Sequence, residues 1–133
     1  MGILQGDDWC NPRPRGVPHV GMRTPWGKAQ TCDKMFEGCW DVTTAGHGGL
    51  KLSAALQRLI PAKWRCSGGW YEEDCEALIV RWFFFDRFDM SPAVRPVLLA
   101  GLKASIIKWW PDLAEDQGAR LTTRMERLQL PLN

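Results

Sequence analysis

The sequence predicts an α+β fold, a small antiparallel β-meander packed against three to four helices. Over residues 39–44, side chains alternate with the period of two that a half-buried strand shows. Over residues 71–85, apolar residues recur at helical spacing and form one stripe. Ser91 followed by Pro92 has the pattern of a capping residue and a first helical position. The two periods in one short chain therefore indicate the mixed class.

The meander is expected to contain three strands. Residues 39–44 form the middle one, because Trp40, Val42 and Thr44 alternate with their neighbours. The run over 28–35 would be its antiparallel partner across a turn at residues 36–38, and 50–52 would be a short third strand. The turn before the third strand contains Gly46, Gly48 and Gly49, which we expect to supply positive φ angles.

Three or four helices are expected, over residues 54–60, 71–85, 92–110 and, more weakly patterned, 112–128. Ser53 would cap the first, Pro61 would end it, and Pro111 would end the third. The acids at 72–74 would occupy the first turn of the second helix, where they complement the helix dipole. Pro96 would lie within the first turn and a half of the third helix. The residues of the third helix that share one 3.6-period face are Val94, Val97, Leu98, Gly101, Leu102, Ser105, Ile106 and Trp109.

At 133 residues the chain has the length of one domain. Residues 1–23 are rich in Pro and Gly and predict an extended arm, which leaves 24–133 as a single α+β domain. Arg13, Arg15 and Arg23 make the arm mildly basic. The arm could wrap the domain surface, or it could reach a partner or a phosphate backbone.

Charge and composition exclude several classes. A net charge of +2 argues against an acidic DNA mimic and against a domain that binds nucleic acid through bulk charge. Five cysteines include no C-x-x-C pair, so a structural zinc site has little support, and no motif indicates a cofactor. No secretory signal and no membrane-length apolar run is visible, so we expect a cytoplasmic protein with free thiols and no membrane contact.

The densest group of reactive side chains combines His47 with the acids that follow Tyr71. His47 could act as a general base with Glu72 or Asp74 as its carboxylate partner. The same donor types could hold a metal, although no recognised metal motif is present. A nucleophilic pair of His47 with Cys39 or Cys32 is a further alternative. The structural alternative is that the histidine decorates a turn and the acids serve a helix N-terminus.

Tryptophan is in excess, with eight residues against a single tyrosine. Buried tryptophans build cores, and exposed ones are enriched in binding surfaces. Trp26, between Pro25 and Gly27, could close one end of the core or line a binding groove. The candidate binding residues are Trp26, Trp70, Glu73, Arg13, Arg15 and Arg23.

Three segments in order carry a resemblance: Thr24-Pro25-Trp26-Gly27-x-Ala29-Gln30, His47-Gly48-Gly49-x-x-Leu52-Ser53 and Trp70-Tyr71-Glu72-Glu73-Asp74-Cys75. The combination resembles a family of small uncharacterised proteins carried by bacteriophages and bacterial mobile elements, a domain of unknown function. The resemblance covers about residues 24–85. It implies a phage or plasmid origin and marks the histidine, its two following glycines and the three acids as family motif positions, but it implies no reaction.

Three functions follow as hypotheses. The first is a non-enzymatic interaction protein encoded by a phage or mobile element, which inhibits a host defence complex of the CRISPR or restriction type in the host cytosol. Its partner would be a host protein or ribonucleoprotein. The second is a small hydrolase or nuclease centred on His47 with Glu72 or Asp74. The third is a nucleic-acid binder that uses the basic arm and stacking tryptophans.

Overall fold

The computed structural model describes residues 16–118, and it confirms the α+β class. The main sheet is antiparallel and contains, in spatial order, β3 (Thr31–Phe36), β4 (Cys39–Thr43), β5 (Gly48–Leu52) and β6 (Trp70–Glu72). A separate hairpin pairs β1 (Arg23–Thr24) with β2 (Gly27–Lys28). The α-helices are α2 (Ala54–Gln57), α3 (Ala77–Phe83), α4 (Arg95–Trp109) and α5 (Pro111–Asp116). Short 3-10 helices are η1 (Ala62–Trp64), η2 (Ser67–Gly69) and η3 (Phe85–Arg87).

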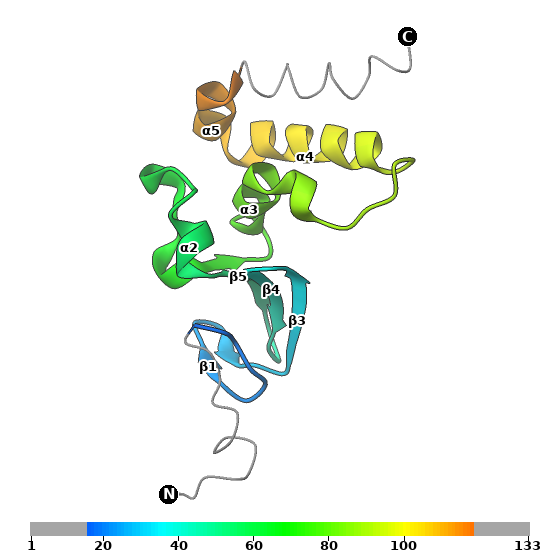
Figure 1. The fold of residues 1–133 in the computed structure, drawn as a ribbon. Helices are drawn as coiled ribbons and strands as arrows, with labels where there is room; N and C mark the ends of the chain where they lie inside the picture. Colours follow the sequence, from blue (N-terminus) through cyan, green and yellow to red (C-terminus); the bar gives the residue numbers. More distant parts are fainter. Residues whose placement is uncertain (1–15, 119–133) are drawn as a thin grey trace, which may run out of the picture.

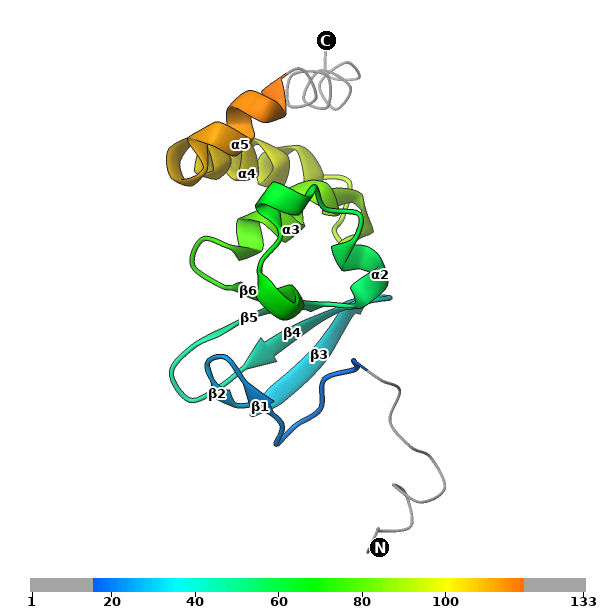
Figure 2. The same ribbon diagram turned by 90° about the vertical axis from the view of Figure 1, so that its left-hand side faces the viewer.

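These elements stack in layers, as Figures 1 and 2 show. The β1–β2 hairpin lies below the main sheet, α2 and α3 lie above the sheet, and α4 and α5 lie above α3. The order β3-β4-β5 is the predicted meander. Its first turn is at Gly38, where φ is +94°, a value that glycine adopts without strain. The expected strand over 28–35 is divided between β2 and β3.

Both faces of the sheet are covered, which the alternation in the sequence does not reveal. On the helix face Cys39, Leu50 and Leu52 are fully or almost fully buried. On the opposite face, called here the hairpin face, Trp40 and Val42 are buried against Ala29. Partly buried residues that complete this second cluster are Val17, Met22, Cys32 and Trp70. The described end of the predicted arm, from residue 16 onward, therefore contributes to the cover of the sheet.

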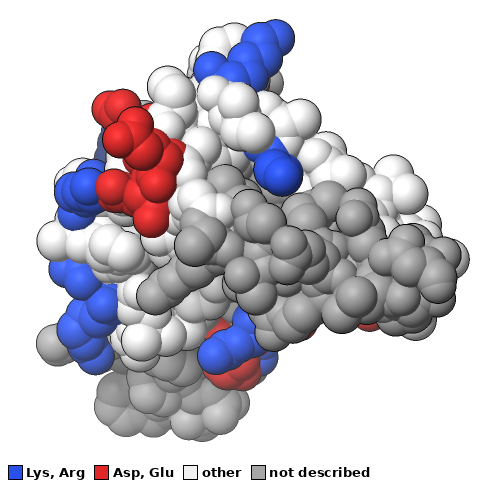
Figure 3. All heavy atoms as spheres, turned by 90° about the horizontal axis from the view of Figure 1, so that it is seen from above, with Lys and Arg blue, Asp and Glu red and all other residues white. Residues whose placement is uncertain are grey.

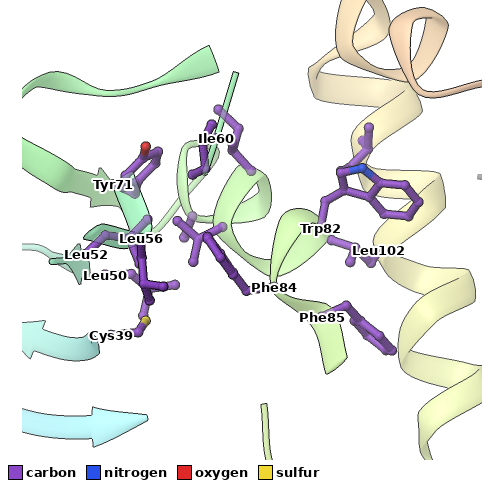
Figure 4. Packing of buried hydrophobic residues seen from close by; sticks show 14 of the residues in the cluster. Cys39, Leu50, Leu52, Leu56, Ile60, Tyr71, Trp82, Phe84, Phe85 and Leu102 are labelled. Carbon is purple, nitrogen blue, oxygen red and sulfur yellow. The ribbon is translucent and has the colours of Figure 1, made fainter. Parts of the chain in front are cut away.

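The main core lies between the sheet, α3 and α4. Figure 4 shows Phe84 pointing toward the sheet residues, while Trp82 and Phe85 face α4 at Leu102. The Trp82 indole N–H donates to the buried Gln117 side chain at 3.2 Å, so the polar atom of this core tryptophan is satisfied. Helix α3 is thus covered on both sides, as its predicted broad apolar stripe requires.

The predicted helix over 71–85 is wrong in its first part. Residues 70–72 form β6, and α3 begins only at Ala77. Gly68 and Gly69 have φ angles of +67° and +79°, and this backbone leads the chain to the open edge of β5. Tyr71 points to the helix face, is fully buried and donates its hydroxyl to the Gln57 side chain at 2.6 Å. The acids at 72–74 therefore do not occupy a helical first turn.

Helix α4 also begins later than predicted. Residues 92–94 form a turn, and the carbonyl of Ser91 accepts from the N–H groups of Val94 and Arg95. The helix starts at Arg95, which places Pro96 in the first turn, where its missing N–H needs no partner. A start at Pro92 would have set the Pro96 ring against a helical carbonyl four residues earlier.

The exposed face of α4 differs from the prediction as well. Leu99, Leu102 and Ile106 are buried, whereas Val97 and Leu98 are 71% and 49% exposed. The predicted apolar face is therefore only partly the core face, because α4 is apolar on more than one side.

Other boundaries are confirmed in part. The Ser53 hydroxyl accepts from the Leu56 N–H and caps α2 as predicted. The predicted end at Pro61 is wrong, because α2 ends at Gln57 and the N–H groups of Leu59 and Ile60 donate to carbonyls three residues earlier, which tightens the chain into turns. Pro111 ends α4 and begins α5. The part of the predicted last helix beyond residue 118 lies outside the described residues. No helix within residues 16–118 has the length and apolar character that crossing a membrane requires.

Candidate functional site

The β1–β2 hairpin places Trp26 at its tip. The Thr24 hydroxyl donates to the Gly27 carbonyl at 2.8 Å and accepts from the Trp26 N–H at 3.1 Å. Gly27 completes the turn with a φ of +127°. The Thr44 hydroxyl lies 3.2 Å from the Trp26 carbonyl, so the hairpin tip is attached to the end of β4. Trp26 is partly exposed in this position.

The turn between β4 and β5 is closed by contacts between Thr44 and His47. The Thr44 N–H donates to the His47 carbonyl at 2.7 Å, and the His47 N–H lies 3.2 Å from the Thr44 hydroxyl oxygen. The backbone of this turn thereby presents the His47 side chain outward, where it is 61% exposed.

The glycines around His47 do not have the predicted role. Gly46, Gly48 and Gly49 all lack a positive φ. At Gly49, however, a β-carbon would lie 2.2 Å from the Tyr71 carbonyl oxygen and 2.6 Å from Cη2 of Trp26. At Gly48 it would lie 2.9 Å from a carboxylate oxygen of Glu73. The two glycines of β5 therefore allow Trp26 and the segment at β6 to approach the strand closely.

His47 meets one of the predicted acids. Its Nδ1 atom lies 3.4 Å from Oε2 of Glu72, whose side chain is 26% exposed. Asp74 does not share this contact, and its N–H donates instead to Oε1 of Glu72 at 3.3 Å. Glu73 is exposed and its N–H donates to the Gly48 carbonyl. The structure thus brings together His47 and Glu72 on an open surface, and only the backbone N–H of Asp74 contacts the same carboxylate.

The chemistry available at this pair is limited. Cys39 points to the helix face, and burial raises the pKa of its thiol to about 12. Burial also raises the pKa of Cys32. Both groups are therefore protonated thiols at neutral pH and are poor partners for a histidine base. Within residues 16–118 no three His, Cys, Asp or Glu side chains are grouped so that they could hold a metal ion.

Trp26 and Trp70 form the wall of a second feature, called here the tryptophan pocket. Their ring centroids are 5.4 Å apart and their planes are at 89°. The pocket has a volume of about 370 Å³ and is lined by Pro25, Trp26, Cys66, Ser67, Gly68, Trp70 and Glu76. The sequence predicted a binding role for the two tryptophans but not for Cys66, which precedes the helix predicted over 71–85, or for Glu76, which was placed within that helix.

Two charged groups adjoin the tryptophan pocket. The Lys51 ammonium lies 5.3 Å from the Trp70 ring centroid and donates to the Gly68 carbonyl at 2.7 Å, and burial lowers its pKa. Glu76 is part of the pocket lining, and its carboxylate accepts the Glu72 N–H at 3.0 Å. The pKa of Cys66 is raised to about 12, mainly by burial and in addition by the charge and hydrogen bond of Glu76.

A larger groove, called here the α4 groove, lies at the β3 edge of the sheet. Its volume is about 720 Å³. Apolar residues predominate in its lining, which comprises Lys34, Met35, Leu78, Arg81, Phe85, Phe88, Asp89, Met90, Val97, Leu98, Gly101, Leu102 and Ser105. The groove therefore includes the exposed side of α4 that the core leaves uncovered.

The basic residues predicted for binding are only partly visible. Arg13 and Arg15 lie outside the described residues, and Arg23 is exposed on β1 opposite Lys28. Figure 3 shows acidic and basic side chains close together on the face over α4 and α5. Lys63 and Asp116 form an ion pair with an Nζ–Oδ2 distance of 2.5 Å. This face has no continuous basic surface among the residues shown.

Fold and surface together define a small α+β domain with two hollows at opposite edges of its sheet. The sequence matches the model of a family described as a domain of unknown function, DUF7007, over residues 19–129, and the chain belongs to this family. The match extends beyond the segments that carried the resemblance and includes α4 and α5. No curated protein and no solved structure matches the chain.

Proposed function

We propose that this protein is a non-enzymatic interaction module that binds a helix of a partner protein in the α4 groove. The observation that carries the proposal is the exposed apolar side of α4. Val97 and Leu98 lie in the groove lining at 71% and 49% exposure, next to Phe88 and Met90. Exposed apolar surface of this kind, with polar groups at its rim, is typical of protein interaction sites.

The groove has the shape and charge for an amphipathic helix. Its α4 residues extend from Val97 to Ser105, about 12 Å along the helix axis. Gly101 has open space where a β-carbon would be, so a second helix could approach α4 closely there. Lys34 and Arg81 stand against the single acid Asp89 in the lining, which favours a partner helix with an acidic residue beside its apolar ridge.

The biological setting that we propose is inhibition of a host defence complex by a protein of phage or mobile-element origin. This part rests on the resemblance of the three motif segments and on the exposed apolar surface, which suits binding and blocking. The partner would then be a protein or ribonucleoprotein of the host cytosol.

Matched variants of α4 test the groove. Val97→Asp introduces a charge into the groove, whereas Ile107→Asp changes a residue of the same helix that is 51% exposed and does not line it. Both substitutions should leave the free energy of unfolding almost unchanged, within about 0.5 kcal/mol. We expect the wild type and Ile107→Asp to retain the same host protein in pull-downs and Val97→Asp to lose it, about 30-fold in affinity for a central contact.

Three results would reject the groove proposal. These are equal retention by Val97→Asp, no retained protein with the wild type, and a wild-type homodimer that Val97→Asp converts to monomer. The last result would identify a second copy as the occupant. The defence role is tested separately by phage plating on strains with and without a CRISPR or restriction system. Expression should raise plating only on defended strains, and Val97→Asp should abolish the effect.

A hydrolase or nuclease centred on His47 is the second candidate, and the 3.4 Å approach of His47 to Glu72 favours it. Its test compares His47→Ala and Glu72→Gln with wild type on nucleic acid and ester substrates. A shared loss of at least about 100-fold is the contribution expected of a general base. Wild-type turnover that persists in both variants would rule it out.

A further inference from the structure

The tryptophan pocket lies beside β6, at the other edge of the sheet from the α4 groove. Segments far apart in the sequence build it: the hairpin tip supplies Trp26, β6 supplies Trp70, and the turn before α3 supplies Glu76. The pocket is thus a product of tertiary structure, and its shape depends on the close approach of Trp26 to Gly49.

The aromatic wall is suited to a positive charge. The faces of indole rings carry negative electrostatic potential and attract ammonium and guanidinium groups. Trp70 already has the Lys51 ammonium over its ring at 5.3 Å. Trp26 stands at 89° to Trp70 and is partly exposed, and within residues 16–118 no Lys or Arg lies over its ring.

Glu76 supplies the matching negative group. One carboxylate oxygen accepts the Glu72 N–H, and the carboxylate is also hydrogen-bonded to the Cys66 thiol. These two donors fix its position without neutralising its charge. Among residues 16–118 no Lys or Arg forms an ion pair with Glu76.

We infer that the tryptophan pocket binds an arginine side chain of a partner protein, with the guanidinium stacked on Trp26 and facing the Glu76 carboxylate. Arginine suits this arrangement because its planar group can lie on an aromatic face and donate to a carboxylate at the same time. The site is distinct from the α4 groove and does not depend on the function proposed for it.

The test uses the full chain and a small probe, N-acetyl-arginine amide. Indole N–H signals of Trp26 and Trp70 are assigned in ¹⁵N NMR spectra with Trp→Phe variants and followed during titration. We expect these two signals to shift with a Kd of about 1 mM, as for a single weak contact. N-acetyl-citrulline amide, which has nearly the same shape without the charge, should bind at least about fivefold more weakly.

Variants then assign the binding to the pocket. Glu76→Gln keeps an oxygen acceptor and should weaken arginine binding at least about fivefold, whereas the exposed α5 variant Glu115→Gln should leave it unchanged. Unshifted indole signals elsewhere show that Glu76→Gln is folded. Equal binding of citrulline, an unchanged Kd in Glu76→Gln, or no shift of either signal would overturn the inference. Val97→Asp should not affect the titration, so failure here and failure of the α4 groove are separate results.

Discussion

The substitution Gly49→Ala tests how the hairpin, β5 and β6 are held together. A methyl group at this position would lie 2.2 Å from the Tyr71 carbonyl oxygen and 2.6 Å from Cη2 of Trp26. The carbonyl belongs to the backbone of β6, which pairs with β5 at Leu50 and Tyr71, so it cannot move away without breaking that pairing. Trp26 can move only by leaving its contact with Trp70.

Overpacking of this kind costs about 1–3 kcal/mol, and a contact with backbone places Gly49→Ala at the upper end. For a chain of this length, about 3 kcal/mol lowers the thermal midpoint by roughly 10 °C. Urea unfolding of the variant measures the loss, with Gly46→Ala as the control. At Gly46 the new methyl group meets no atom within 4 Å and φ is not positive, so stability should change by less than about 0.5 kcal/mol. Equal stability of the two variants would refute the close approach.

Three further outcomes are expected. Tyr71 is the single tyrosine, and burial raises its pKa to about 12, so the phenolate absorbance of the folded protein should rise near pH 12. Because the unfolded group titrates near pH 10, its contribution to stability is complete below that pH and is lost as the pH rises toward 12; a folded midpoint near 10 contradicts this. Glu76→Gln should accelerate alkylation of the Cys66 thiol, because the Glu76 carboxylate raises the pKa of this thiol. Mass spectrometry measures the alkylation rate, and an unchanged or slower rate would show that Glu76 and Cys66 are not in contact. Thr44→Val should lower the free energy of unfolding by about 1–2 kcal/mol, because it removes the buried Thr44 hydroxyl, which contacts His47 and the Trp26 carbonyl. The control Thr43→Val loses one exposed hydrogen bond to Thr31 and should lower the free energy of unfolding by less. Similar losses in both variants would contradict this.

Local signals in the sequence were sufficient to predict the β-meander and several helix boundaries. The alternation at Trp40 and Val42, the cap at Ser53 and the break at Pro111 depend on residues within a few positions of one another. The predicted start of the second helix was wrong, because the spacing of Tyr71 and Cys75 fits a helix as well as it fits the strand and turn that these residues form. What decided the outcome was the open edge of β5, some twenty residues earlier in the chain, which paired with β6.

In the candidate site, too, contacts between residues far apart in the sequence decide what local signals cannot predict. The contact between His47 and Glu72 was predicted as a possibility, and the structure contains it. The reason for Gly49 could not be read locally, because the atoms that exclude a side chain there belong to Trp26 and Tyr71. The exposed side of α4 was also hidden. The sequence shows a 3.6-period face that includes Val97 and Leu98, but in a helix that is apolar on several sides this pattern does not tell which side the core will cover.

The positions of the two hollows have a consequence for how partners are bound. The α4 groove includes Lys34 and Met35 of β3, whereas the tryptophan pocket includes Trp70 of β6, and β3 and β6 are the two edge strands of the sheet. Three strand spacings separate them, about 14 Å. Val97 and Glu76 line different hollows that share no lining residue, so substitutions at the two positions are expected to act additively. In the double variant Val97→Asp/Glu76→Gln, additive losses in affinity for a captured partner would mean that one partner spans the sheet and uses both sites. A loss from Val97→Asp alone would assign the tryptophan pocket to a different partner.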